Sequence, residues 1–235
     1  MRSVVAAIVF VIVTIVMSVL SIPAAVIDRT GRSYLWLARI WSKIFLLLFG
    51  VKLKVIGAEN IRKGIPTVYV ANHASYADAP AVLAAVPDNV RLMFRDSLTR
   101  IPIWGWALRL SPFLLISRTN ATKAKASLEN ATRVIRSGAA VLLFPEGTRT
   151  ADGEVQSFKR GAFKIAIESG AQVIPVAIIG TFELLPRTET LPNWGRPIEI
   201  RIGAPIKLEI GSEGRAAEIQ LAALAEESLR ALIEG

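Results

Sequence analysis

The apolar positions of the chain fall into two patterns that meet near residue 51. Between Arg2 and Asp28 there is no charged residue, and the run is dense in Val, Ile, Leu and Ala. A helix over residues 4–27 would extend about 36 Å, enough to cross a hydrocarbon core of about 30 Å. We therefore predict a membrane-associated helix here, which Pro23 ends or kinks.

Two other interpretations of this first segment are weaker. A secretory signal peptide would use Arg2 as its charged start and residues 21–25 as a cleavage region, but the apolar run is longer than the usual stretch of about 7–15 residues. A buried core helix seldom reaches this length without a charge in a domain of this size. A membrane helix therefore remains the preferred interpretation.

The next apolar segment, residues 34–51, differs in kind. Arg32, Arg39 and Lys43 fall near one helical stripe, and aromatic side chains supply much of the remaining surface. That division suits a helix at the headgroup boundary of a membrane. The first helix would either span the bilayer or form a hairpin with the second in one leaflet. We take residues 1–50 as a membrane-associated two-helix segment and residues 51–235 as one further domain.

From residue 51 onward, short β-branched and aromatic runs alternate with longer amphipathic ones. Strands are predicted at residues 51–56, 67–71, 90–94, 113–117, 140–144, 173–179 and 198–202. Helices are predicted at residues 79–86, 121–137, 159–169 and 213–233. Alternation of this kind predicts an α/β fold with a mixed, mostly parallel central sheet of about seven strands flanked by helices.

Composition narrows the possible chemistry. The 235 residues carry a formal net charge of +9, which attracts anionic lipid headgroups, phosphorylated substrates or nucleic acid. The apolar N-terminus favours lipid, and the basic, aromatic-interleaved stretch of a nucleic-acid binder is missing. The chain has no Cys and one His, which excludes thiolate metal sites, cysteine nucleophiles and multi-histidine metal sites. Any imidazole chemistry must use His73.

His73 and Asp78 occupy a segment that runs from a predicted strand through a loop into a helix. On a continuous helix this spacing would rotate them about 140° apart, so a turn is needed if they are to meet, and Ser75 can cap the following helix to make it. A carboxylate on one imidazole nitrogen leaves the other free as a general base. The alternative is a loop histidine beside an unrelated first-turn helix acid, and spacing alone does not choose between them.

A second group of polar residues follows the predicted strand 140–144. Phe-Pro-Glu-Gly-Thr-Arg ends at Arg149, and Lys159 and Arg160 open the next helix. Arg149, Lys159 and the free N–H groups of a helix start are suited to bind a phosphate. The alternative is a surface turn with solvated charges.

The two groups together resemble the glycerolipid acyltransferase family, and most closely its bacterial 1-acyl-glycerol-3-phosphate acyltransferases. The resemblance covers about residues 50–205 and rests on Asn-His-x-Ser-x-x-Asp and Phe-Pro-Glu-Gly-Thr-Arg in this order, with Phe-Lys-Arg-Gly-Ala-Phe and Val-Ile-Pro-Val-Ala after them. It implies that His73 is the base and Asp78 orients it. It also implies that a block of four residues binds the phosphate-bearing acceptor: Glu146, Gly147, Thr148 and Arg149.

One block departs from the family pattern of Lys-x-x-Leu followed by an Asp-Arg pair. The basic residues are present as Arg95 and Arg118, but Ser117 stands where the acidic partner of Arg118 would be. We expect Arg95, Arg118 and Lys159 to contribute to acceptor binding, and the identity of the acceptor stays open.

The implied reaction moves a fatty acyl group from acyl-CoA or acyl carrier protein to lysophosphatidic acid, giving phosphatidic acid. No metal or cofactor is needed, no nucleic acid is bound, and the enzyme would work at the cytoplasmic membrane with its catalytic domain on the cytoplasmic side. Three alternatives remain: an acyltransferase for another lysolipid, a serine esterase using Ser75, and a non-catalytic lipid-binding scaffold. The Gly-x-Ser-x-Gly pattern of the commonest esterases is absent.

Overall fold

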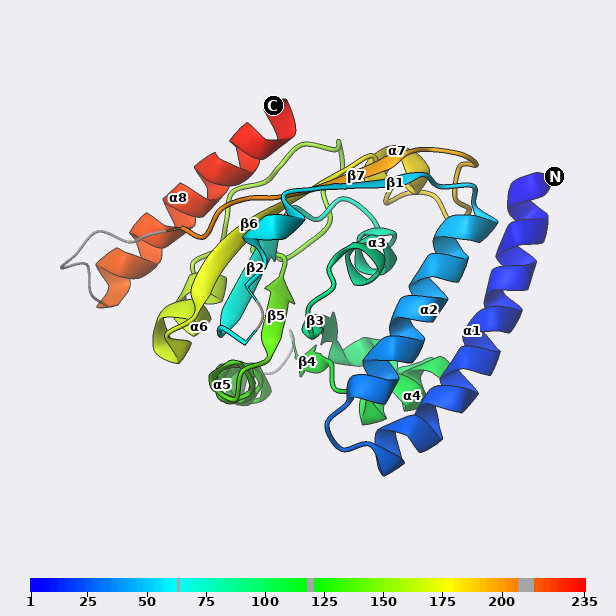
Figure 1. Ribbon diagram of the computed structural model, residues 1–235, viewed down its shortest axis with the longest axis horizontal. Coiled ribbons are helices and arrows are strands. Elements are labelled where there is room, and N and C mark those ends of the chain that lie inside the picture. The colour runs from blue at the N-terminus through cyan, green and yellow to red at the C-terminus, as the bar shows by residue number, and fades with distance from the viewer. Residues whose placement is uncertain (63, 118–120, 207–213) are drawn as a thin grey trace.

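The computed structural model describes residues 1–62, 64–117, 121–206 and 214–235 (Figure 1). Its centre is a seven-stranded sheet in the order β1-β7-β6-β2-β5-β3-β4. The strands, in chain order, are β1 Leu53–Ile56, β2 Thr67–Ala71, β3 Val90–Arg95, β4 Leu114–Ile116, β5 Ala140–Leu143, β6 Gln172–Ile179 and β7 Ile198–Ile202. All seven fall within one or two residues of the predicted ranges.

The strand directions place the segments that carry the candidate site residues at one edge of the sheet. β2 pairs in parallel with both β5 and β6, and β3 pairs in parallel with β4 and β5. β7 runs antiparallel to β6, and β1 runs parallel to β7. The predicted mixed, mostly parallel sheet is therefore confirmed. The carboxyl ends of β2, β3, β4 and β5 all meet at one edge, where functional side chains of open α/β sheets are usually found.

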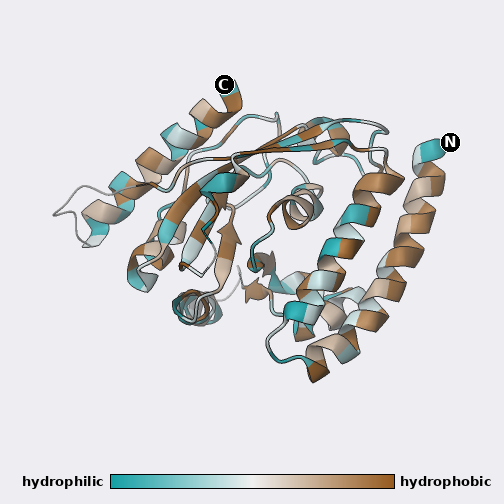
Figure 2. Ribbon diagram, in the orientation of Figure 1, coloured by the Kyte–Doolittle hydropathy of each residue, from teal (hydrophilic) through white to brown (hydrophobic). Residues whose placement is uncertain are grey.

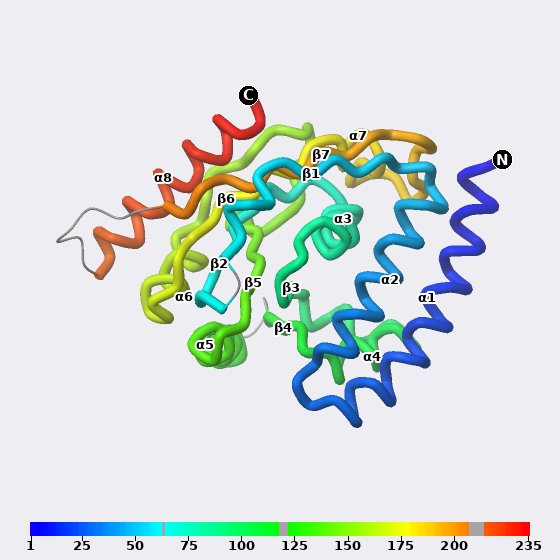
Figure 3. The backbone as a smooth tube through the Cα atoms, viewed as in Figure 1, coloured from blue at the N-terminus to red at the C-terminus, as the bar shows by residue number. Residues whose placement is uncertain are grey.

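Helices cover both faces of this sheet (Figures 1 and 3). They are α1 Arg2–Ile27, α2 Arg32–Leu48, α3 Asp78–Ala85, α4 Trp104–Leu110, α5 Ala121–Arg136, α6 Gly161–Ser169, α7 Thr181–Leu184 and α8 Gly214–Glu234, with 3-10 turns at Ala58–Asn60 and Asp96–Arg100. α2 and α3 lie on one face, whereas α5, α6 and α8 lie on the other.

The core follows this division through the pleat of the strands. Along β2, Tyr69 and Ala71 belong to the apolar cluster on the α2–α3 face, and Val68 and Val70 belong to the cluster on the α5–α6–α8 face. Every residue of β2 is buried, as expected for a parallel strand covered on both sides. The loop that follows β2 is therefore anchored on the most buried strand of the sheet.

The two N-terminal helices form a hairpin, in which α2 packs against α3 and α1 packs against α4. The Trp41 indole N–H donates to the Thr14 hydroxyl at 2.9 Å, and the Phe10 ring lies 5.0 Å from that of Phe45. Pro23 lies inside α1, which continues to Ile27, so the expected end of the helix at this proline is wrong.

α1 is apolar along most of its length (Figure 2). Among the described helices, α1 alone is long and apolar enough to cross a membrane, and only 17% of its most apolar stretch is buried. Exposed Ile8, Ile12 and Val16 illustrate the pattern. An apolar surface of this extent indicates membrane association.

Sequence patterns missed the short elements α4 and α7. α4 has seven residues, too few to establish a helical period. It is fixed instead by tertiary contacts: a Cβ on Gly105 would approach the Thr99 carbonyl carbon to 2.7 Å, so the helix packs against the turn before it without room for a side chain. Of the predicted helices, 159–169 starts later, at Gly161, and residue 213 lies outside the described residues.

Candidate active site

His73 follows β2 and is held through its main chain. The side-chain amide of Asn72 exchanges two hydrogen bonds of 2.8 Å with the main chain of Ile178, which ties the end of β2 to β6. The His73 N–H donates to Glu146 Oε1 at 2.8 Å, and the Thr150 N–H donates to the His73 carbonyl oxygen at 2.8 Å. These bonds fix the backbone of His73 from both neighbouring strands.

Asp78 supplies the partner of the imidazole. Its Oδ2 lies 2.7 Å from His73 Nδ1 and also accepts the main-chain N–H groups of Ala74 and Ser75, each at 2.9 Å. The chain therefore turns between His73 and Asp78, as the spacing required, and α3 begins at Asp78 itself. Three donors converge on one carboxylate oxygen, which holds this turn together.

The turn sets which ring nitrogen of His73 remains free of Asp78. When Asp78 accepts the proton on Nδ1, the neutral imidazole keeps Nε2 unprotonated. None of the described residues hydrogen bonds to Nε2. The ring stacks on Phe144, with centroids 4.1 Å apart, and His73 lines a large cavity. The side chain of Asp78 is fully buried, so its negative charge is available to a protonated His73 without screening by water.

Ser75 makes the turn differently from the predicted helix cap. Its hydroxyl accepts the Ala77 N–H at 3.0 Å and donates to the Leu185 carbonyl oxygen at 2.7 Å, and Ala77 stands at the cap position. The residue is fully buried. A hydroxyl bound in this way is not placed as a nucleophile, which argues against the esterase alternative.

Glu146 lies beneath the site. Its side chain is 1% exposed, and its two carboxylate oxygens accept the N–H groups of His73 and Gln156 at 2.8 and 3.3 Å. Burial raises the pKa of Glu146 to about 7, although both hydrogen bonds oppose the shift. The neighbouring residues Pro145 and Gly147 line the cavity, whereas Glu146 does not. Contact between Glu146 and the acceptor stays a prediction, and the geometry gives this residue a positioning role.

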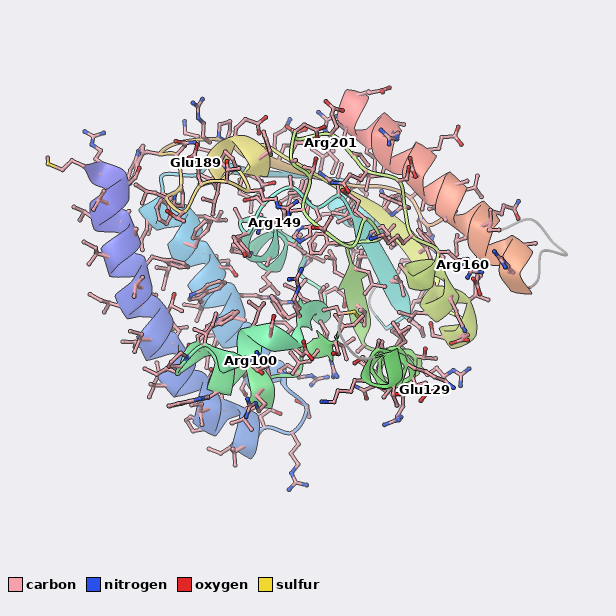
Figure 4. The ribbon with its side chains drawn as sticks, turned by 180° about the vertical axis from the view of Figure 1, so that it is seen from behind. Arg100, Glu129, Arg149, Arg160, Glu189 and Arg201 are labelled. Atoms are coloured by element: carbon pink, nitrogen blue, oxygen red, sulfur yellow. The ribbon has the colours of Figure 1, made fainter. Side chains whose placement is uncertain are left out.

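Arg149 lies with its guanidinium 3.5 Å from the centroid of the Tyr76 ring. Its Nη1 is buried and has no hydrogen-bond partner among the described residues. The Arg187 guanidinium donates to the Arg149 carbonyl oxygen at 3.1 Å. Both arginines line the cavity, and Figure 4 shows Arg149 beside α3, far from Arg160. A cation with an unused buried N–H is suited to an anionic ligand.

Other predicted binding residues line the same cavity as Arg149. Gly147 has φ +77, and a Cβ on it would lie 2.8 Å from Lys159 Nζ, so the missing side chain makes room for this ammonium group. Thr148, Lys159 and Arg95, from the end of β3, all line the same cavity. Apart from the buried Glu146, every described member of the predicted binding set thus lines this cavity. Arg118 lies outside the described residues.

The cavity measures about 1260 Å³ and reaches well beyond His73. Apolar residues of α1, α2 and α4 line one part of it, including Phe10, Phe45 and Leu108. Its volume and lining suit a long hydrocarbon chain beside a polar centre. Among the described residues no group of His, Asp and Glu side chains could hold a metal ion.

Comparison with known proteins agrees with this geometry. The sequence model of the family named Acyltransferase matches residues 52–179, which is more than half of the chain. The chain belongs to the acyltransferase family. The matched range contains the His73–Asp78 pair and the whole 144–149 turn.

Named relatives in this family include 1-acyl-sn-glycerol-3-phosphate acyltransferases. The chain is 32% identical to the chloroplast protein of Arabidopsis thaliana over 73% of its own length and 48% of the relative's. It is 32% identical to the protein of Borreliella burgdorferi over 59% and 56% of the two lengths. The chain thus spans about half the length of these curated relatives. A crystal structure of the 1-acyl-sn-glycerophosphate (LPA) acyltransferase of Thermotoga maritima superposes with a TM-score of 0.78 at 25% identity, covering 98% of this chain and 97% of that one.

Sequence patterns missed three side chains at the site. Phe144 was predicted as the end of a strand and the start of the motif that ends at Arg149, but the stacking of its ring on the imidazole was not. Tyr76 lies within the His73–Asp78 segment, and its position beside two functional residues was the one available signal. Arg187 gave no signal, because its contact with Arg149 joins residues 38 positions apart.

Proposed function

We propose that this acyltransferase moves a fatty acyl group from an acyl thioester to the free hydroxyl of 1-acyl-glycerol-3-phosphate, giving phosphatidic acid and a free thiol. The observation that carries the proposal is the 2.7 Å pair of His73 and the buried Asp78 at a cavity that also contains Arg149 and Lys159. This cavity combines a general base, cations for a phosphate and a long apolar region. An acyl transfer to a lysolipid phosphate needs all three.

His73 acts as the base in this mechanism. Nε2 takes the proton of the acceptor hydroxyl while its oxygen forms a bond to the thioester carbonyl carbon. The imidazolium that forms is stabilised by Asp78, whose Oδ2 lies on the other ring nitrogen. When the tetrahedral intermediate collapses, the carbon–sulfur bond breaks and the thiolate takes the proton from Nε2. The chain's own residues thus account for every proton in the reaction.

The acceptor phosphate binds at Arg149 and Lys159. The unused Nη1 of Arg149 and the ammonium of Lys159 above Gly147 face the same cavity. Arg187 and Arg95 add positive charge around them, and the proposal extends this role to Arg118. A phosphate monoester can accept several charge-assisted hydrogen bonds from such a group, whereas a phosphocholine headgroup offers a lower charge.

The exposed apolar residues of α1 support association with a membrane. We propose the cytoplasmic membrane, with the catalytic domain on the cytoplasmic side. At that surface the lysolipid and the product remain in the bilayer while the reactive ends enter the cavity. The donor is acyl-CoA or acyl carrier protein, and the reaction requires no cofactor. Whether α1 spans the bilayer or lies in one leaflet does not change this chemistry.

Acyl transfer by purified protein in detergent tests the proposal directly. We expect the protein to transfer palmitate from palmitoyl-CoA or palmitoyl carrier protein to 1-acyl-glycerol-3-phosphate, and His73→Ala to reduce kcat to the background rate, because no other imidazole is present. Circular dichroism and thermal unfolding of the variant check that it is folded. Full activity in a folded His73→Ala protein would overturn the mechanism.

A panel of acceptors separates the alternatives. A phosphate site predicts kcat/KM at least about 10-fold higher for 1-acyl-glycerol-3-phosphate than for 1-acyl-glycerophosphocholine, since a hydrogen bond to a charged group contributes about 1.5–3 kcal/mol. The reverse preference would assign the protein to another lysolipid. Thioester hydrolysis at a rate that added lysolipid does not change would indicate an esterase.

A further inference from the structure

The lining of the cavity extends to both faces of the sheet. One part lies under α1, α2 and α4, as described above. The other lies between α5 and α6, which pack side by side on the opposite face (Figure 1). Five residues line this second part: Ala124 and Leu128 from α5, and Gly161, Ala162 and Ile165 from α6. We call it the α5–α6 groove. His73 and Phe144 belong to the same cavity, so a ligand in the groove can reach the base.

Small side chains give the α5–α6 groove its space. A Cβ built on Gly161 meets no atom within 4 Å, although its backbone does not have a positive φ that would require glycine. Ala124 and Ala162 add only methyl groups to the wall. The groove therefore has room for a slim, unbranched ligand.

The groove also offers hydrogen-bond donors. Gly161 and Ala162 are the first two residues of α6, where main-chain N–H groups have no acceptor inside the helix. No described residue accepts either of these N–H groups. A pure hydrocarbon chain would leave both donors unpaired, whereas a chain that carries amide carbonyl groups can accept their hydrogen bonds. The wall of the groove thus fits a slim chain with amides better than it fits an acyl tail.

Two lysines of α5 lie next to the groove. Lys123 and Lys125 stand on either side of the groove residue Ala124 in the sequence, and both are exposed. Glu129, the single acid of α5, lies 3.9 Å from Lys125. Lys159 lies at the inner end, just before α6. A ligand that lies in the groove with a phosphate at its exposed end would meet complementary charge.

We propose that the α5–α6 groove binds the phosphopantetheine arm of the acyl donor. The arm is a slim chain with two amides and a terminal phosphate, and it is common to acyl-CoA and acyl carrier protein. In this arrangement the phosphate lies near Lys123 and Lys125, the thioester lies at His73, and the acyl chain continues into the part of the cavity under α1 and α2. The inference rests on the proposed function, since it assumes a thioester donor.

Cysteine protection tests this site without relying on turnover. Because the chain has no Cys, Ala124→Cys places the only thiol in the groove, and Ala126→Cys places it on the exposed side of the same helix. The rate of labelling by N-ethylmaleimide is measured by mass spectrometry on the full-length variants. The ligands are S-hexadecyl-CoA, the same thioether on acyl carrier protein, and 1-acyl-glycerol-3-phosphate.

We expect the donor thioethers to slow labelling of the Ala124→Cys variant about 10-fold at ten times Kd, and to leave the Ala126→Cys variant unchanged. Protection by either thioether supports the site, and the thioether that protects identifies the carrier. Equal protection by 1-acyl-glycerol-3-phosphate, or no protection by either thioether, would overturn it.

Steady-state kinetics give a second readout. Gly161→Leu and Ala124→Leu fill the groove and should raise the KM for the acyl donor about 10-fold with little change in the KM for the lysolipid, whereas Ala126→Leu should change neither. If the thioethers protect the groove but the wild-type protein acylates no lysolipid, the proposed function fails and the site stands. If the protein acylates lysolipid without any protection, the site fails and the function stands.

Discussion

His73 and Arg149 lie in neighbouring loops at the same edge of the sheet, yet the protein holds them in opposite ways. The main chain of His73 is hydrogen bonded on both sides, and its ring is fixed by Asp78 and Phe144. Arg149 has a buried Nη1 with no partner among the described residues, and its main contacts are the Tyr76 ring and Arg187.

This difference matches the two proposed roles, a general base and a cation that binds an anionic ligand. A general base must keep one geometry and one tautomer through every turnover, so satisfying its polar neighbours inside the protein is favourable. A cation that binds an anionic ligand must keep some hydrogen-bonding capacity free until the ligand arrives. Removing groups from each loop should therefore affect kcat in the first case and KM in the second.

Among substitutions that leave His73 in place, Asp78→Asn should have the largest effect. The amide oxygen can still accept from Ala74 and Ser75, so the turn can persist, but the negative charge that stabilises protonated His73 is lost. We expect kcat to fall about 10²- to 10⁴-fold, less than for His73→Ala, with a smaller change in the KM for the lysolipid. Steady-state kinetics with both substrates varied give the two constants.

Thermal unfolding of Asp78→Asn separates this loss from a collapse of the turn. A folded variant whose kcat equals that of the wild type would show that the carboxylate charge is dispensable. The proposed difference between His73 and Arg149 would then fail for His73.

Arg149→Ala should have an intermediate effect, expressed in KM. Loss of a charged donor to the acceptor phosphate should raise the KM for 1-acyl-glycerol-3-phosphate about 10- to 100-fold. Tyr76→Leu removes the ring beneath the guanidinium and should raise the same KM about 2- to 10-fold, while Tyr76→Phe, which keeps a ring, should stay close to the wild type.

Arg160→Ala is the matched control for Arg149. Arg160 lies 3.6 Å from Glu218 and does not line the cavity, so its loss should leave the KM for the lysolipid unchanged. If the Arg149 and Arg160 variants behaved alike, general surface charge rather than a local phosphate site would explain the binding.

Glu146→Gln should have the smallest effect on turnover and a distinct effect on stability. The folded protein raises the pKa of Glu146 from its ordinary 4.5 to about 7, so the folded state holds this proton more tightly than the unfolded chain. Its contribution to the free energy of unfolding is therefore present below pH 4.5 and is lost as the pH rises to about 7. Denaturant unfolding at a series of pH values should show this decline in the wild type and a flatter profile in Glu146→Gln. Parallel profiles for the two proteins would contradict the shift.

Sequence patterns predicted the sheet well because its strands are buried runs bounded by turns. β2, with five buried residues between polar segments, is the clearest case. The pair of His73 and Asp78 was predictable as a possibility, and the turn between them followed from helical geometry. The site depended more on tertiary contacts. Nothing local indicates that Glu146 turns inward to the His73 N–H, or that Arg187 reaches Arg149, because both contacts join distant segments.

Two hydrogen bonds of the His73 main chain, its N–H to the Glu146 carboxylate and the Thr150 N–H to its carbonyl oxygen, also bear on the speed of the proposed reaction. They tie the segment after β2 to the loop after β5, so His73 stands on a braced segment rather than on a free loop. The conformational entropy of the histidine is lost once, when the protein folds, and not again at each encounter with substrate. Only the lysolipid and the acyl thioester remain to be ordered when the reaction begins.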